Sequence, residues 1–368
     1  MLGNFSKFST SEIISVVFYA VFWLVIAAQI SPNEYGEIHY LIGIATIVSG
    51  VSIFGSGSSL VVLISKKEYI QSTITLISLI ISSVGFVIAY FLINRIDVGL
   101  LIFGVIFYNL GGYILQGKQA YGKLLLYNII QKSIFIALSE ISIMFDNQQI
   151  VLALSASQFI FLNIIIRNFR KSDVNFYLLR RKICFFASNY GNALLSIMKD
   201  NIDKIIILPI LGYSVLGNYS LALQGILLLT GFITILTRYS LPLLSKGENV
   251  QKFFKFSYLA SIPMTIVGYF LLPLGIENLL PKYEHTIEAI KIISFSIPFY
   301  IIANIFQTRF IAAEKSQFVI IGNIIFFITI TTGMILFGTH YGILGVAYSY
   351  LISMIIHSVF FYSLRKKI

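Results

Sequence analysis

The sequence predicts an all-α integral membrane protein with about twelve transmembrane helices. These form two six-helix lobes, related by a pseudo-twofold axis along the membrane normal. Three observations lead to this prediction: the composition, the lengths of the apolar segments, and the distribution of Lys and Arg. Of the 368 residues, 57% are hydrophobic and only 11% are charged. A soluble globule of this length must cover its surface with polar groups, so the composition is typical of a polytopic membrane protein.

The apolar segments each approach the roughly 20 residues that a spanning helix needs. Backbone polar groups find no water inside a bilayer, so we expect each segment to be a helix. The predicted spans are residues 11–30, 37–64, 71–93, 98–117, 124–145, 150–166, 183–208, 216–237, 256–273, 288–308, 318–337 and 342–363. Pro263 and Pro298 lie inside two of these spans. Each removes a backbone donor, so we expect both spans to be kinked.

The Lys and Arg residues set the orientation of the spans, because cytoplasmic loops are enriched in them. With Lys7 and the rest of the N-terminal segment inside, the predicted outer loops hold only Arg95, Lys282 and Lys291 of the chain's 26 Lys and Arg. Both termini are therefore expected to be cytoplasmic, in a multi-pass protein of the cytoplasmic (inner) cell membrane. The net charge of +11 then faces anionic lipid head groups, and no nucleic-acid partner is expected.

The chain is expected to divide into an N-terminal six-helix lobe at 1–170, a basic cytoplasmic linker at 171–182 and a C-terminal six-helix lobe at 183–368. A faint internal repeat supports two halves. The sequence EYG at 34–36 and the sequence GNYS at 217–220 each precede an apolar span that ends in a polar, charged segment. Six spans per half is an even number, so both halves would insert with the same orientation.

Catalytic and metal-binding patterns are missing from the sequence. Cys184 is the single cysteine, and the histidines His39, His285, His340 and His357 are scattered among different spans and loops. The chain has no HExxH pattern and no Walker lysine motif. We therefore expect no metal site, no cofactor and no enzymatic activity.

The seventh predicted span contains four charged residues in the segment MKDNIDK at 198–204. Charges at bilayer depth are costly, and they usually face a protein interior or a water-filled cavity. On one helix Lys199 lies four residues before Asp203, and Asp200 lies four before Lys204, so each pair can meet. Two interpretations remain open: a polar stripe along a substrate path, or self-neutralising pairs that fix the packing of the helix.

The fifth predicted span carries Lys132 and Glu140. Eight residues separate them by about 12 Å along a helix, so they are not a direct pair. Lys132 either extends toward the cytoplasmic head groups or faces a cavity. Glu140 lies deeper, where an apolar surrounding is harder to reconcile with its charge.

Several segments together resemble a known family. The sequences DKIIIL at 203–208 and LGNYSLA at 216–222 are similar to the signature of the seventh and eighth spans of polysaccharide biosynthesis proteins, the oligosaccharide-lipid (O-antigen, Wzx-type) flippases. Similar agreement is found for SPNEYG at 31–36, PLLS at 242–245 and YGILGVA at 341–347. These flippases belong to the multidrug/oligosaccharidyl-lipid/polysaccharide exporter (MOP) superfamily.

The resemblance implies a transporter with two lobes around a central cavity that opens alternately to each side. Its implied substrate is a polyprenyl-diphosphate-linked oligosaccharide, moved to the outer leaflet for surface polysaccharide assembly. Other implied partners are H⁺ or Na⁺, membrane lipids and further polysaccharide-assembly membrane proteins. Relatives often carry a base in the second span, whereas residues 58–65 have none before Lys66.

The residues expected to serve transport are the charges of the fifth and seventh spans. A diphosphate needs cationic partners, and a carboxylate in the same cavity can exchange a proton or Na⁺. The candidate substrate-binding cations are Lys199, Lys204 and Lys132, and the candidate ion-coupling residues are Asp203, Asp200 and Glu140.

The sequence is also compatible with other functions. A multidrug/cation antiporter of the same superfamily would favour an acidic cavity without the two lysines of the seventh span. A multi-span polysaccharide polymerase or acyltransferase would need a larger outer loop or a His/Arg constellation near one face. A passive scaffold would leave the buried charges unexplained.

Overall fold

The computed structural model describes residues 21–54, 57–145, 149–245, 249–313 and 315–367. Within these ranges the regular structure is helical throughout, without strands, so the all-α prediction is confirmed there. Lys7 and the first ten residues of the predicted span 11–30 lie outside the described residues. Contacts divide the described chain into two compact units: unit 1 holds the described residues of 41–201, and unit 2 holds those of 21–40 and 202–367.

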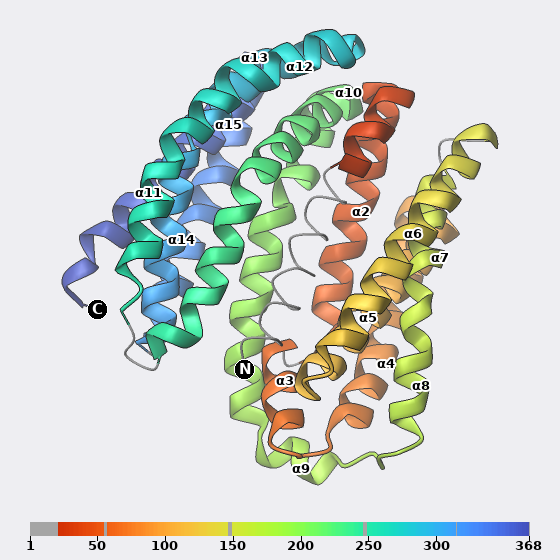
Figure 1. Cartoon of the computed structure of the whole chain (residues 1–368). Coiled ribbons are helices and arrows are strands. Elements are labelled where there is room, and N and C mark those ends of the chain that lie inside the picture. The colour runs from red at the N-terminus through yellow and green to blue at the C-terminus, as the bar shows by residue number, and fades with distance from the viewer. Residues whose placement is uncertain (1–20, 55–56, 146–148, 246–248, 314, 368) are drawn as a thin grey trace. The chain divides into compact units, whose positions relative to one another are not determined.

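Unit 1 is built around one buried helix. Its elements are the end of α2 (Pro32–Ser52), α3 (Gly57–Ser65), α4 (Gln71–Ile93), α5 (Ile96–Gly117), α6 (Tyr121–Phe145), α7 (Ile150–Gln158), η2 (Phe159–Phe161), α8 (Leu162–Phe169), α9 (Phe176–Arg181) and the start of α10 (Ile183–Ser245). Helix α5 packs against α3, α4, α6, α7 and α8 (Figure 1). Its small residues permit this: a Cβ on Gly111 would lie 2.7 Å from Phe161 Cδ1.

Unit 2 contains the helical residues 21–29 and the remaining elements. These are the start of α2, the rest of α10, α11 (Gln251–Ile266), the π-helical turn η3 (Val267–Leu271), α12 (Leu272–Leu279), η4 (Pro281–Tyr283), α13 (Glu284–Ser294), α14 (Ile297–Ala312), α15 (Ser316–Ser363) and η5 (Arg365–Lys367). Helix α15 packs against α13 and α14, and α11 packs against α14.

The apolar segments form helices of spanning length. Seven described helices are long and apolar enough to cross a membrane, and nine spans result if each of two bent pairs counts as one. Helix α10 has 63 residues, or about 95 Å, against a hydrocarbon core of about 30 Å. Breaks at Gly212 (φ 81°) and Gly342 (φ 58°) divide α10 and α15, so each has the length for two crossings. Glycine tolerates these positive φ values. The total of twelve spans, the pseudo-twofold axis, the lobe boundaries and the cytoplasmic termini stay predictions.

Both prolines predicted to disturb a span mark an irregularity. Pro263 lies inside α11, and a π-helical turn begins at Val267, four residues later. A bend of 51° separates Pro281–Ser294 from α14, and Pro298 occupies the first turn of α14. A proline is tolerated in the first turn because the N–H that it lacks would have no partner there. The bend of 51° just before α14 confirms the kink expected at Pro298.

The two glycines of the repeated motif lie where two helices of unit 2 meet. A Cβ on Gly36 of α2 would lie 1.9 Å from the carbonyl oxygen of Tyr213 on α10. A Cβ on Gly217 would lie 1.9 Å from the carbonyl oxygen of Pro32. Only glycine allows the backbones to approach this closely. The contact fixes the second half of α10 against the start of α2.

Candidate functional site

The four charges of the seventh predicted span lie on α10 before its break at Gly212. They differ sharply in burial. Side-chain exposure is 17% for Lys199, 67% for Asp200, 7% for Asp203 and 15% for Lys204. Three of the four charges are therefore largely removed from the surface of the chain, whereas Asp200 stays open.

Ion pairs within this segment join sequence neighbours. Lys199 Nζ lies 3.8 Å from Asp200 Oδ1, and Lys204 Nζ lies 3.7 Å from Asp203 Oδ1. The backbone N–H of Lys204 also donates to Asp203 Oδ1 at 2.9 Å. These pairs join adjacent residues, whereas the expected pairs are four residues apart, and the expected pairing stays a prediction. Each observed pair belongs to one unit, the first to unit 1 and the second to unit 2.

Two buried polar side chains of unit 2, Tyr219 and His39, interact with the charges of the Asp203–Lys204 pair. The hydroxyl of Tyr219, which is fully buried, lies near the Asp203 carboxylate and interacts with its charge. The charge of Lys204 acts on His39 of α2, whose side chain is 2% exposed. Buried charges persist only where partners offset their loss of hydration. This part of unit 2 supplies such partners in an otherwise apolar setting.

Aromatic rings hold His39 in place. Its ring centroid lies 4.6 Å from that of Trp23 and 4.4 Å from that of Tyr35. The ring of Tyr35 also packs edge-on against that of Tyr283, with the two ring centroids 5.8 Å apart. The Tyr283 hydroxyl donates a hydrogen bond to the carbonyl oxygen of Ile30 at 3.3 Å. Residues of the first span and of the segment that follows it thus pack around the histidine.

A hydrogen bond fixes α13 to α10 beside this group. The Thr286 hydroxyl donates to Asn218 Oδ1 at 2.9 Å and lies 3.1 Å from the Asn218 carbonyl oxygen. Both side chains are buried. Asn218 and Tyr219 belong to a motif that carries the family resemblance, but no pattern in the sequence indicates their partners, which lie far away along the chain.

The fifth-span residues lie on α6 of unit 1. Lys132 is partly buried and Glu140 is exposed. Both lie on α6, so the separation of about 12 Å along the helix applies to them, and the absence of a direct pair stays a prediction. The buried face of α6 is instead fixed by Gln131, whose amide donates to Ser157 Oγ of α7 at 2.9 Å.

A basic group lies outside the spans of unit 1. Lys118, just after α5, donates to Asn168 Oδ1. Burial lowers the pKa of Lys118, and the positive charges of Lys171 and Lys123 lower it further. Because these like charges gather at the end of the helices, this region favours anionic surroundings.

No group of three or more His, Cys, Asp or Glu in the described ranges is arranged to hold a metal ion.

Solved structures resemble the chain over nearly its full length. The lipid II flippase MurJ in an inward closed conformation matches with a TM-score of 0.78 at 18% identity, covering 97% of this chain and 87% of that chain. The chain has the MOP-transporter fold.

Two further solved structures carry the same fold. A multidrug resistance MATE family transporter of the MOP superfamily, inward-facing, matches with a TM-score of 0.70 at 16% identity, covering 96% of this chain and 94% of that chain. A MOP superfamily transporter from Pyrococcus furiosus matches with a TM-score of 0.67 at 16% identity, covering 99% and 95%. No family model and no curated protein matches the chain. The helical MOP-transporter fold is confirmed, whereas the two six-helix lobes around a central cavity and the Wzx-type family stay predictions.

Proposed function

We propose that the protein is a membrane transporter that flips a polyprenyl-diphosphate-linked oligosaccharide from the cytoplasmic to the outer leaflet. The observation that carries the proposal is a largely buried ion pair, Asp203–Lys204, inside a spanning helix of a chain with the MOP-transporter fold. A buried ion pair rarely stabilises a protein more than apolar packing would. Charges retained at bilayer depth are therefore best explained by transport.

The lysines supply what a diphosphate requires. Lys199 and Lys204 are largely buried cations on α10, and Lys132 is a partly buried cation on α6. Ammonium groups form charge-assisted hydrogen bonds with phosphate oxygens, which offset the cost of moving the head group out of water. We assign these three lysines to the substrate.

The carboxylates supply the coupling to H⁺ or Na⁺. Lys204 Nζ neutralises Asp203 at 3.7 Å. When a phosphate oxygen engages Lys204, the Asp203 carboxylate loses part of its compensation, so its affinity for a proton or Na⁺ changes. The two binding equilibria are then linked, and each ligand changes the binding free energy of the other by the same amount. Asp200 and Glu140, both exposed on the chain, are the further candidates.

The finer architecture belongs to the same proposal. Twelve spans in two six-helix lobes, with both termini in the cytoplasm of a multi-pass inner-membrane protein, would let the head-group site open alternately to each side. Membrane lipids and other proteins of polysaccharide assembly are its proposed partners. The described helices, including the divided α10 and α15, have the lengths that this architecture needs.

A complementation assay tests the function. A strain that lacks its own oligosaccharide-lipid flippase is given this protein, and surface polysaccharide is measured. We expect export with the wild type, reduced export with Lys204→Gln, and unchanged export with the control Lys282→Gln, which removes a charge from an exposed position on η4. Unchanged export by both variants at equal expression would remove Lys204 from the substrate site.

A multidrug/cation antiporter is the second candidate, because MATE transporters share the fold, with a TM-score of 0.71 for one in an outward-facing conformation. The same strains distinguish the two. Drug resistance gained without surface polysaccharide, across several sugar types, would favour the antiporter.

A further inference from the structure

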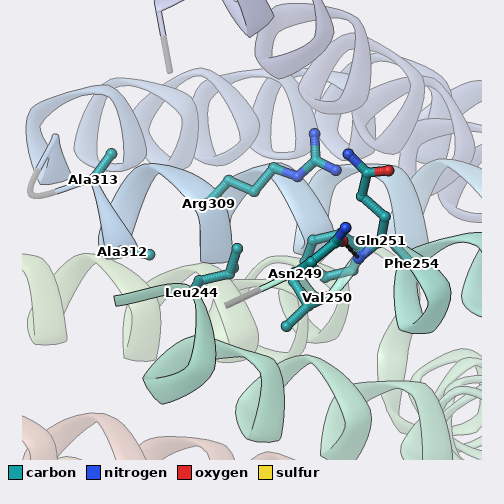
Figure 2. Close-up of a pocket in the computed structure, with 8 residues that line it drawn as sticks. All are labelled: Leu244, Asn249, Val250, Gln251, Phe254, Arg309, Ala312 and Ala313. Atoms are coloured by element: carbon teal, nitrogen blue, oxygen red, sulfur yellow. Dashed lines mark hydrogen bonds between the residues drawn. The ribbon is translucent and has the colours of Figure 1, made fainter. Parts of the chain in front are cut away.

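A cavity of about 390 Å³ lies in unit 2, away from the α10 charges. It is formed where α11 begins and α14 ends, next to the end of α10 (Figure 2). Its apolar wall includes Val250, Phe254 and Ala312, and its polar groups are the amides of Asn249 and Gln251 and the guanidinium of Arg309. The volume falls at the lower end of the range for small-ligand pockets.

Arg309 is held by rings, which leave its donors open. The guanidinium carbon lies 4.8 Å from the ring centroid of Phe254 and 5.6 Å from that of Phe306. Such contacts engage the flat face of the group and leave its five N–H donors at the edge. Within the described part of the chain, no carboxylate pairs with this guanidinium and no oxygen accepts a hydrogen bond from it. In Figure 2 the side chains of Arg309 and Gln251 extend toward the same part of the cavity.

The position of Arg309 at the end of α14 has a simpler explanation that falls short. A cation in the last turn of a helix interacts favourably with the helix dipole. That attraction explains a positive charge, but it does not explain a guanidinium that lies over two aromatic rings beside a cavity with two amides. A planar group whose five N–H donors are unused among the described residues matches the oxygens of a phosphate.

The surroundings strengthen the preference for an anion. A second guanidinium, that of Arg365, has its carbon 4.0 Å from the ring centroid of Tyr362. The Tyr362 ring in turn packs against Phe306, with the two ring centroids 5.9 Å apart. Lys252 and Lys255 are exposed on the first turns of α11. This end of unit 2 is therefore basic, with Arg309 as the cation that the cavity encloses.

We propose that this cavity binds the phosphate of an amphiphilic phosphate ester, such as a phospholipid head group. The guanidinium would hold two phosphate oxygens, as Arg does in bidentate pairs. The amides of Asn249 and Gln251 would donate to the ester or glycerol oxygens, and the apolar wall would accept the first carbons of the ligand. The cavity lies at the end of a span, which is where lipid head groups are found. This site is separate from the proposed transport site and does not depend on it.

The test uses the full-length protein, purified in detergent and freed of phospholipid. Binding of phosphatidylglycerol, of glycerol phosphate and of inorganic phosphate is measured by native mass spectrometry and by thermal shift. Arg309→Gln is compared with the control Lys255→Gln, which removes one charge from the same region outside the cavity. We expect at least a tenfold weaker affinity for phosphatidylglycerol with Arg309→Gln and less than a twofold change with the control.

The outcomes separate the sources of the phosphate. Binding of phosphatidylglycerol alone identifies a lipid site, and binding of glycerol phosphate with the same dependence on Arg309 identifies a soluble phosphate ester. Ala312→Leu keeps the charge and narrows the cavity, so it should also weaken binding, and it serves as the test if Arg309→Gln does not fold. Equal affinity in the wild type and Arg309→Gln, or equal losses in Arg309→Gln and Lys255→Gln, would overturn the proposal.

Discussion

The Asp203–Lys204 pair allows a sharp test of how buried charges act in this protein. Lys204→Gln removes the cation that lies 3.7 Å from the carboxylate of Asp203, whose side chain is 7% exposed. At an effective dielectric constant of about 20, two unit charges at this distance attract by about 4.5 kcal/mol. Since breaking a buried pair costs about 3–5 kcal/mol, we expect a loss of about 3 kcal/mol in the free energy of unfolding.

The double variant Asp203→Asn/Lys204→Gln separates charge from packing. It removes both charges, so no uncompensated ion remains, and we expect a loss of only about 1 kcal/mol. The coupling free energy of the double-mutant cycle is then about 2 kcal/mol or more, well above the error of additivity. Equilibrium unfolding in mixed detergent micelles measures each variant.

The neighbouring pair on the same helix is the control. Lys199 and Asp200 are also adjacent and lie 3.8 Å apart, but Asp200 is 67% exposed. Screening should therefore keep the effect of Lys199→Gln to about 1 kcal/mol or less. Additive losses at Asp203 and Lys204, or an equal coupling in both pairs, would refute the argument from burial.

Three further predictions concern a close glycine contact, a buried hydrogen bond and the lowered pKa of Lys118. Gly217→Ala should cost about 3 kcal/mol in unfolding free energy, because its Cβ would lie 1.9 Å from a carbonyl oxygen, whereas Gly122→Ala, with nothing within 4 Å, should be neutral or stabilising. Thr286→Val should cost about 1–3 kcal/mol, because it leaves the buried Asn218 amide oxygen without its donor. Lys118 has a pKa lowered from 10.5, so the unfolded chain binds more protons between its folded pKa and 10.5. Stability should therefore rise with pH across that window, and Lys118→Gln should remove part of the rise in melting temperature; an identical pH profile in the variant would contradict this.

Span positions could be predicted because they depend on local properties. The prediction of 71–93 coincides with α4, since an apolar run between polar residues has one way to satisfy its backbone in a membrane. The end of the seventh span was placed before Pro209, but α10 continues to the break at Gly212. A proline can be accommodated in a membrane helix, whereas the φ of 81° needs glycine, so the glycine decides where the helix is interrupted.

The candidate site could be predicted only in part. The sequence located the charges of α10, because ionisable residues in an apolar run stand out. It did not predict the ion pairs between adjacent residues, since these depend on side-chain rotamers. It also missed His39 and Tyr219 as neighbours of the Asp203–Lys204 pair, because residues so distant in the chain are brought together by packing within unit 2.

The motifs that carry the family resemblance have a structural role of their own. Gly36 and Gly217 allow α2 and α10 to touch, and the residues beside them, Tyr35 and Tyr219, pack around His39 and Asp203. The motifs thus build the frame that holds the charged pair, whereas Lys204 is the group assigned to the substrate. It follows that changes in the motif glycines should impair folding and transport together, whereas a change at Lys204 in a correctly inserted protein should impair transport first.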